Sequence, residues 1–137
     1  TAGGMKTSTI AVIFASIISV FKNKANAELF KKRISDENVK NAFAIFFLYL
    51  FIFLFSGLVI SKVENVPLLT GLFETASAIG TVGLTLGITP ALGLISKIIL
   101  IILMFFGRLG GLTLIYATLG EGKQQNYKYP VEKIIVG

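Results

Sequence analysis

The residues with the most specific chemistry lie in Phe73–Thr89, which reads FETASAIGTVGLTLGIT. From its middle onward, glycines and threonines alternate: Gly80, Thr81, Gly83, Thr85, Gly87 and Thr89. Such a backbone leaves N–H and C=O groups unpaired, which a membrane tolerates only inside protein or along a water-filled path. Thr81, Val82 and Gly83 offer successive carbonyls with no bulky side chain at the glycine, as in filters whose oxygens replace the water shell of K⁺. We therefore predict a pore loop in which these three residues form an ion filter.

The composition of the whole chain favours a membrane protein. Of its 137 residues, 54% are hydrophobic, and the mean hydropathy is +0.81, well above soluble usage. The chain contains neither Cys nor His, so thiol chemistry and the usual transition-metal ligands are excluded. It also lacks a convergent pair of carboxylates. We therefore expect no enzyme activity and no covalent cofactor, and the only metal expected is a transported ion.

The positions of the basic residues indicate which side of a membrane each segment faces. The net charge is +6, and six of the thirteen basic residues fall between Lys22 and Lys40, beside apolar segments. Positive charge next to membrane helices is typical of cytoplasmic loops. We therefore predict a cytoplasmic connector over 22–40 and a cytoplasmic tail over 120–137. The expected surroundings are membrane lipid, and no nucleic acid partner is expected.

A first charge-free run, Thr7–Phe21, is 15 residues long. As a helix it covers about 22 Å, less than the roughly 30 Å of a bilayer core. A short apolar helix entered through Gly3 and Gly4 fits the second half of a broken membrane helix, so residues 1–21 are expected to be such an end. The alternative is a signal peptide with its cleavage site at Ala25–Ala27. Two lysines between the run and that site argue against it.

The segment 41–119 predicts a helix, a pore loop and a second helix. Asn41–Ser61 has 21 residues without a charge, six of them Phe, which is enough for a spanning helix. Leu68–Ile79 predicts a short helix whose C-terminal dipole favours a cation near Gly80. Thr89-Pro90 reads as N-cap and first residue of a last helix over Ala91–Leu119. The fold class is therefore an all-α integral membrane protein of the potassium-channel-like kind.

Four motifs together resemble the Trk/Ktr/HKT family of potassium- and sodium-translocating membrane proteins. FETASAIGTVGLTLGITP resembles the pore loop of the fourth repeat of a Ktr-type subunit, with Gly83 as its filter glycine. TAGGMKTST resembles the end of the glycine-rich intramembrane loop of the third repeat. FGRLGGLTL resembles the arginine-bearing stretch of the fourth repeat's last helix, and YPVEKIIVG resembles the C-terminal end of the family.

The resemblance implies K⁺ uptake, or Na⁺ uptake, by a multi-pass protein of the cell membrane. The family has four repeats, so this chain corresponds to the end of the third and the whole fourth, and the missing N-terminal repeats are its first expected partners. A homodimer and a cytoplasmic nucleotide-binding regulatory subunit are also implied. Relatives are sometimes labelled subunit J of a V-type sodium ATPase. The alternative is a single-hairpin channel in which four copies build one pore, and the reading frame upstream of Thr1 distinguishes the two.

The resemblance also implies a gate formed by Gly3, Gly4, Lys6 and Arg108. A charge well inside an apolar helix costs about 2.5–3.5 kcal/mol on insertion scales unless it is paired or hydrated. Free carbonyls of the glycine-rich loop are the partner that the resemblance supplies for Arg108, and snorkelling to the surface is the alternative.

Two other charged residues lie within the apolar segments. Glu74 is either a cation ligand or a carboxylate that accepts hydrogen bonds from backbone N–H groups behind the filter, and we favour the second interpretation. Lys97 is expected to snorkel.

Overall fold

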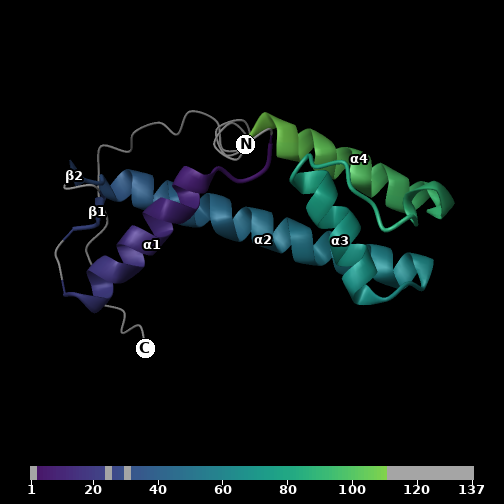
Figure 1. The fold of residues 1–137 in the computed structure, drawn as a ribbon, viewed down its shortest axis with the longest axis horizontal. Helices are drawn as coiled ribbons and strands as arrows, with labels where there is room; N and C mark the ends of the chain where they lie inside the picture. The colour runs from purple at the N-terminus through teal and green to yellow at the C-terminus, as the bar shows by residue number, and fades with distance from the viewer. Residues whose placement is uncertain (1–2, 24–25, 30–31, 111–137) are drawn as a thin grey trace, which may run out of the picture.

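The computed structural model describes residues 3–23, 26–29 and 32–110. In this part of the chain, four α-helices form the body and a short hairpin joins the first two (Figure 1). The first helix lies along the N-terminal half of a much longer second helix, and the third and fourth lie along its C-terminal half (Figure 1).

Helix α1 (Thr7–Phe21) begins and ends with the first charge-free run. The connector after it contains two short strands, β1 (Glu28–Leu29) and β2 (Lys32–Arg33), which pair antiparallel with Glu28 opposite Arg33. The all-α expectation is therefore wrong at this hairpin. It holds for the elements that form the body of the molecule.

Helix α2 (Asp36–Glu64) is longer than the charge-free run that predicted it. The Ser35 side chain accepts a hydrogen bond from the Asn38 N–H, and Asp36 and Glu37 occupy the first turn, where acidic residues complement the helix dipole. This N-terminal cap starts the helix five residues before Asn41. At the other end the helix stops at Asn65, whose φ is 53°. Within the described residues, α2 is the helix long and apolar enough to cross a membrane.

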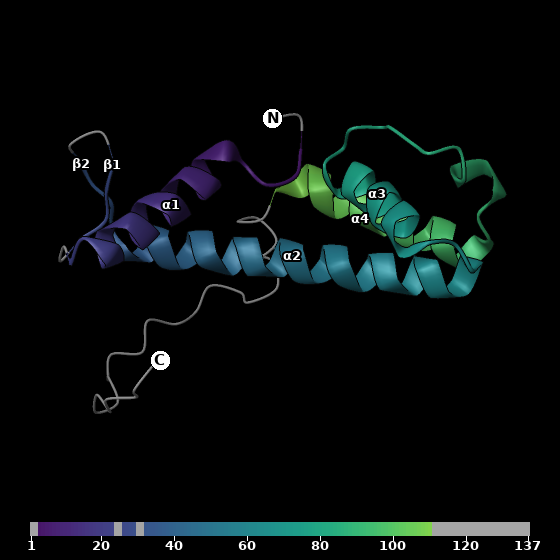
Figure 2. The ribbon, with the colours of Figure 1, turned by 60° about the horizontal axis from the view of Figure 1, so that its bottom comes forward.

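Helix α3 (Leu68–Ile79) confirms the predicted short helix. It runs from the C-terminal end of α2 back along α2, and the chain then reverses and returns to the end where α3 began (Figure 2). There it forms the 3₁₀ turn η1 (Thr89–Ala91) and enters helix α4 (Leu94–Leu109), which runs antiparallel to α2 (Figure 2).

The predicted last helix, Ala91–Leu119, is wrong in its limits. Thr89 and Pro90 belong to the 3₁₀ turn, and the N-cap of α4 is Gly93. The helix ends at Leu109 because Gly110 has a φ of 82°, which a right-handed helix does not accommodate. The remainder of that expected helix and the tail 120–137 lie outside the described residues.

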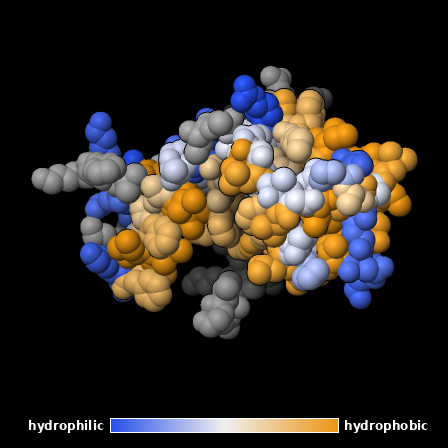
Figure 3. Space-filling view, turned by 45° about the vertical axis from the view of Figure 1, so that its right-hand side comes forward, coloured by the Kyte–Doolittle hydropathy of each residue, from blue (hydrophilic) through white to orange (hydrophobic). Residues whose placement is uncertain are grey.

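The outer surface of the helices is largely apolar. Hydrophobic residues cover most of the face in view, and hydrophilic ones gather toward its margins (Figure 3). On α2, the side chains of Phe47, Phe51 and Phe55 are 60%, 68% and 57% exposed. Soluble monomers rarely expose an apolar surface this extensive, so it indicates contact with lipid or with other protein.

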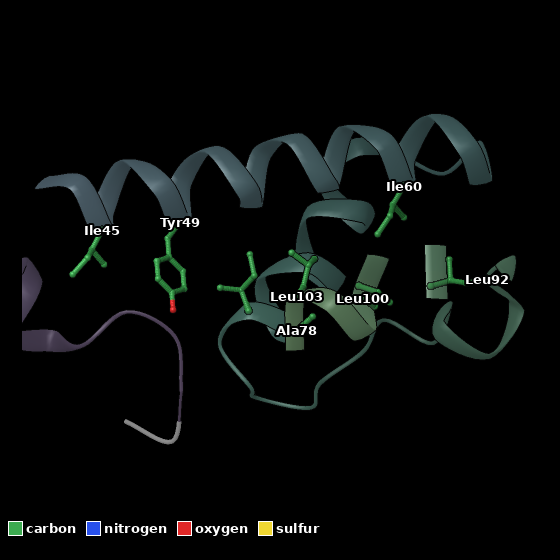
Figure 4. Packing of buried hydrophobic residues seen from close by; sticks show 8 residues of the cluster. Ile45, Tyr49, Ile60, Ala78, Leu92, Leu100 and Leu103 are labelled. Carbon is green, nitrogen blue, oxygen red and sulfur yellow. The ribbon is translucent and has the colours of Figure 1, made fainter. Parts of the chain in front are cut away.

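The core lies where α3 and α4 meet α2. Ile45, Tyr49 and Ile60 point from one face of α2 toward the segments packed against it (Figure 4), and they share a buried cluster with Ala78, Leu92, Leu100 and Leu103. The Tyr49 hydroxyl donates to the Phe106 carbonyl at 3.3 Å, which pairs the one polar group of this cluster of side chains. The core therefore holds α3 between the two longer helices.

Two glycines allow α3 to approach α2 closely, and they support a prediction about stability. A Cβ on Gly71 would lie 2.8 Å from the Gly57 carbonyl oxygen, which is rigid backbone, whereas a Cβ on Gly57 would meet the flexible end of Leu72. In the full-length protein, Gly71→Ala should destabilise the fold by about 1–3 kcal/mol through overpacking. Gly57→Ala should change stability by less than about 1 kcal/mol, since a gain in helix propensity offsets a small side-chain shift. Thermal unfolding in detergent measures both, and equal losses would contradict this packing.

Candidate functional site

The chain reverses direction immediately after α3, at residues 81–83 (the 81–83 turn). The backbone N–H groups of Gly80, Thr81 and Val82 donate to the carbonyls of Ala76, Ala78 and Ser77 at 2.8, 3.1 and 2.9 Å. These bonds pair three of the carbonyls that the end of a helix leaves without an internal partner. The N-terminal end of the 81–83 turn is thus hydrogen-bonded to the C-terminal end of α3.

Two residues of the 81–83 turn have left-handed backbone conformations. Thr81 has φ 52° and Gly83 has φ 79°. A glycine adopts this region freely, but a β-branched residue does so at a cost of about 1–3 kcal/mol, and only where its surroundings enforce it. The 81–83 turn is therefore a strained segment held in place by its neighbours.

Gly83 is constrained by its conformation and not by crowding. Among the described residues, a Cβ on Gly83 would have no atom within 4 Å. Apart from its two chain neighbours, no described residue crowds this position. The positive φ alone disfavours other residues there.

Glu74 organises the segment that follows the turn, residues 84–89 (the return segment). Its carboxylate is 3% exposed. Oε1 accepts hydrogen bonds from the Thr85 hydroxyl at 2.6 Å and from the Leu86 N–H at 2.9 Å, and Oε2 accepts one from the Thr89 hydroxyl at 2.8 Å. Glu74 thus accepts a hydrogen bond from one backbone N–H and from two hydroxyls. Its expected place behind an ion filter stays a prediction.

A second carboxylate holds the beginning of α4. Glu64, the last residue of α2, accepts hydrogen bonds from the Gly93 N–H at 2.9 Å and from the fully buried Ser96 hydroxyl at 2.5 Å. An acceptor at a helix N-terminus pairs N–H groups that the helix itself leaves unpaired. Sequence reasoning missed this contact, and the polar Ser96 within an apolar helix was the available signal.

The N-terminal glycines lie against the 81–83 turn from the other side. The Gly4 N–H donates to the Gly107 carbonyl at 2.8 Å. A Cβ on Gly3 would overlap the Thr81 side chain, and one on Gly107 would overlap the Ile79 carbonyl oxygen. The Thr81 hydroxyl is buried here without a hydrogen-bond partner among the described residues. Glycines from two segments distant in sequence, the N-terminal loop and α4, therefore enclose the end of α3.

The four expected gate residues are only partly brought together. Arg108 lies in the last turn of α4 and is exposed, so its expected position well inside a helix is wrong. A cation at that end of a helix is favoured by the dipole. Gly4 bonds to Gly107, the residue before Arg108, and Gly3 lies against Thr81, but Lys6 is exposed at the N-cap of α1. The backbone hydrogen bond from Gly4 to Gly107 joins the glycine-rich loop to α4.

A cavity of about 300 Å³ opens beside this junction. Gly3, Gly4 and Met5 line it on one side, and Tyr49, Ile79 and Gly80 line it on another. Its walls are mostly apolar apart from backbone groups and the Tyr49 hydroxyl. The sequence contained no signal for this cavity, because its walls come from three separate segments.

Lys97 was expected to snorkel, and its side chain is indeed exposed. Its Nζ donates to the Pro90 carbonyl at 3.1 Å, beside the 3₁₀ turn.

Comparison with known proteins identifies the family of this arrangement. Residues 1–128 match the family model described as TrkH, cation transport protein. The chain belongs to the TrkH family. It is 40% identical to the potassium/sodium uptake protein NtpJ of Enterococcus hirae, with 100% of the chain aligned to 32% of that protein. It is also 36% identical to the Ktr system potassium uptake protein B of Bacillus subtilis, with 100% of the chain aligned to 31% of it.

A third relative has the same relation to the chain. The Ktr system potassium uptake protein B of Vibrio alginolyticus is 34% identical, over 100% of the chain and 30% of that protein. The chain therefore spans about one third of the length of the curated relatives it matches. The predicted resemblance to the Trk/Ktr family is confirmed, and the segment belongs to a family of membrane transport proteins.

The close approach of Gly3 to Thr81 predicts a compensating pair of substitutions. In the full-length protein, Gly3→Ala should lower stability by about 1–3 kcal/mol, because the new methyl group occupies the space of the Thr81 side chain. Adding Thr81→Ala should restore part of the loss, since it removes the overlapping hydroxyl and methyl groups. Thermal unfolding of both single variants and the double variant measures the coupling. Strictly additive effects would show that these residues do not meet.

Proposed function

We propose that this chain is the C-terminal part of a subunit that takes up K⁺, or Na⁺, across the cell membrane. Membership of the TrkH family supports cation transport, and the names of the relatives supply the two candidate ions. The observation that carries the proposal is the strained, glycine-containing turn at the end of α3, in the stretch where the family resemblance places an ion filter.

In this proposal the carbonyls of Thr81, Val82 and Gly83 form one quarter of the ion-binding ring. Carbonyl oxygens replace the water that the ion gives up on entry. The negative end of the α3 dipole lies next to them and favours a cation. No covalent step is involved, so the protein acts by coordination and by control of access.

The rest of the ring comes from the missing N-terminal repeats of the same protein. The relatives are about three times as long as this chain, which favours four repeats in one protein over four copies of a single hairpin. Val82, Leu84 and Leu86 are 59%, 61% and 55% exposed, and apolar side chains so placed suit contact with those repeats. We further propose a homodimer with a cytoplasmic nucleotide-binding regulatory subunit, and a cytoplasmic position for 22–40 and the C-terminus.

The gate in this proposal is the glycine-rich loop beneath the 81–83 turn. The hydrogen bond from Gly4 to Gly107 supports it, because it holds the loop across the end of α3. Arg108 follows Gly107 directly, so its charge acts beside the same contact. Lys6 is the last residue of the glycine-rich loop before α1, and this position is its only link to the proposed gate.

The filter is tested by a matched pair of glycine substitutions in the full-length protein. Gly83 and Gly110 both have positive φ, at 79° and 82°, and apart from chain neighbours a Cβ on either would have no described atom within 4 Å. Gly83→Ser should lower the preference for K⁺ over Na⁺ about tenfold, because a shift in the turn moves the carbonyls that replace hydration. Gly110→Ser introduces the same backbone strain at the end of α4, outside the 81–83 turn and the return segment, and should leave that preference unchanged.

Uptake of both ions in a host deficient in K⁺ transport measures this pair, with the protein amounts compared. Gly83→Asp should act in the same direction as Gly83→Ser. An unchanged preference in both Gly83 variants would remove Gly83 from the filter.

The gate predicts a different phenotype for Arg108→Ala. Transport should rise, or become less dependent on its regulator, while the preference for K⁺ stays intact, because the loop loses a charged neighbour and the filter does not. Lys97→Ala, which removes a basic residue from the other end of α4, is the control and should keep normal regulation. Flux assays with and without the regulatory subunit decide, and normal regulated flux in Arg108→Ala would favour snorkelling.

A further inference from the structure

The conformation of the 81–83 turn depends on what holds it at both ends. Toward α3 it is anchored by the hydrogen bonds of the Thr81 and Val82 N–H groups to Ala78 and Ser77. A turn that contains a left-handed threonine needs a second anchor, since one fixed end lets the strain relax by rotation of the other. The second anchor must therefore lie in the return segment.

Glu74 provides that anchor, and the first residue that it binds, Thr85, lies two residues beyond the turn. It accepts from the side chain of Thr85, the backbone of Leu86 and the side chain of Thr89, which together span the return segment. Glu74 itself sits on α3, five residues before Ile79. The two ends of the turn are thus fixed to the same rigid helix.

We propose that Glu74 is a positioning residue for the 81–83 turn, setting its conformation from behind without contacting the ion. This inference rests on the proposed filter function. Both carboxylate oxygens are already engaged by donors from the return segment, and the side chain is buried. The role of Glu74 is therefore to accept these hydrogen bonds, and its charge is not what recognises the ion.

The glutamine variant separates these two roles. In Glu74→Gln the amide oxygen can still accept from Thr85 and Leu86, and the amide N–H can donate to the Thr89 oxygen. The Thr89 hydrogen can then turn to the Thr85 oxygen, 2.7 Å away. In Glu74→Ala the Thr85 hydroxyl, the Leu86 N–H and the Thr89 hydroxyl lose the carboxylate as their acceptor. The loss of a hydrogen-bond acceptor is unfavourable for the donors that it leaves unpaired.

The first measurement is the concentration dependence of K⁺ and Na⁺ uptake by the full-length protein in the deficient host. Glu74→Ala should raise the KM for K⁺ about tenfold and lower the K⁺/Na⁺ preference to match, as expected when the return segment loses the acceptor that holds it. Glu74→Gln should stay within about twofold of the wild type. Thr89→Val should follow Glu74→Ala in direction, and Thr89→Ser, which keeps the hydroxyl, should follow the wild type.

Glu64→Ala is the matched control, because it removes a carboxylate with the same kind of partners but at the N-terminus of α4. It should lower thermal stability and the amount of protein while leaving the KM ratio of the two ions unchanged. A merely structural role for Glu74 would give that same pattern in Glu74→Ala.

The second measurement is hydrogen exchange of the purified full-length protein, which does not depend on transport. Peptides covering the return segment should exchange at least about tenfold faster in Glu74→Ala than in the wild type, and at the wild-type rate in Glu64→Ala, since unpaired amides lose their protection.

Three results would overturn the inference. Unchanged exchange in Glu74→Ala would show that Glu74 is no anchor. Faster exchange with unchanged ion preference would show that the anchor does not position the filter, while cation uptake by the wild type would leave the proposed function intact. A defect in Glu74→Gln as large as that in Glu74→Ala would assign the role to the charge. Wild-type protein that takes up neither ion would instead overturn the proposed function itself.

Discussion

The structure depends on one constraint, the need to pair backbone groups that leave helical geometry in an apolar setting. The 81–83 turn and the return segment cannot satisfy their N–H and C=O groups within a helix, and unpaired groups in hydrocarbon are strongly unfavourable. The last carbonyls of α3 take up the first amides of the turn, and the Glu74 carboxylate takes up the Leu86 amide together with two threonine hydroxyls. A buried carboxylate is stable in such a place because three donors surround it. The glycine- and threonine-rich composition of this stretch and the acidic residue inside α3 therefore belong to one physical solution.

Close approach of backbones is the second theme. Gly57 and Gly71 let α3 lie against α2, and Gly107 lets α4 pass over the Ile79 carbonyl. Gly3 does the same for the N-terminal loop at Thr81. Membrane helices associate largely by packing, and small residues at their interfaces make that packing tight. The end of α3 is consequently enclosed by α2, α4 and the N-terminal loop. A displacement of the N-terminal loop would therefore change the contacts of Thr81 in the 81–83 turn.

The apolar surface agrees with a chain that functions inside a larger assembly. The exposed phenylalanines of α2 lie on a regular helix, whereas the exposed leucines of the return segment lie on irregular backbone. Irregular backbone at membrane depth requires surrounding protein. Lipid can cover the α2 face. For the return segment, the proposed function supplies other repeats, and the relatives are about three times as long as this chain.

The sequence alone determined the helices that local patterns encode, the class of protein and the family. Charge-free length predicted α1 and the core of α2, and Pro67 and Gly80 marked the two ends of α3, because apolar runs and breaking residues act on neighbouring positions. The helix ends that depend on capping were not predicted. The Ser35 cap begins α2 before the predicted Asn41, and the conformation of Gly110 ends α4 before the predicted Leu119. Only the tertiary structure decided that Glu74 holds the return segment, that Glu64 holds Gly93 and Ser96, and that Gly3 and Gly107 meet the end of α3. The partners in these contacts are at least 11 residues apart, and Glu64 and Ser96 are 32 apart. No local sequence pattern specifies which donor such an acceptor will bind, because the packing of the helices brings the two together.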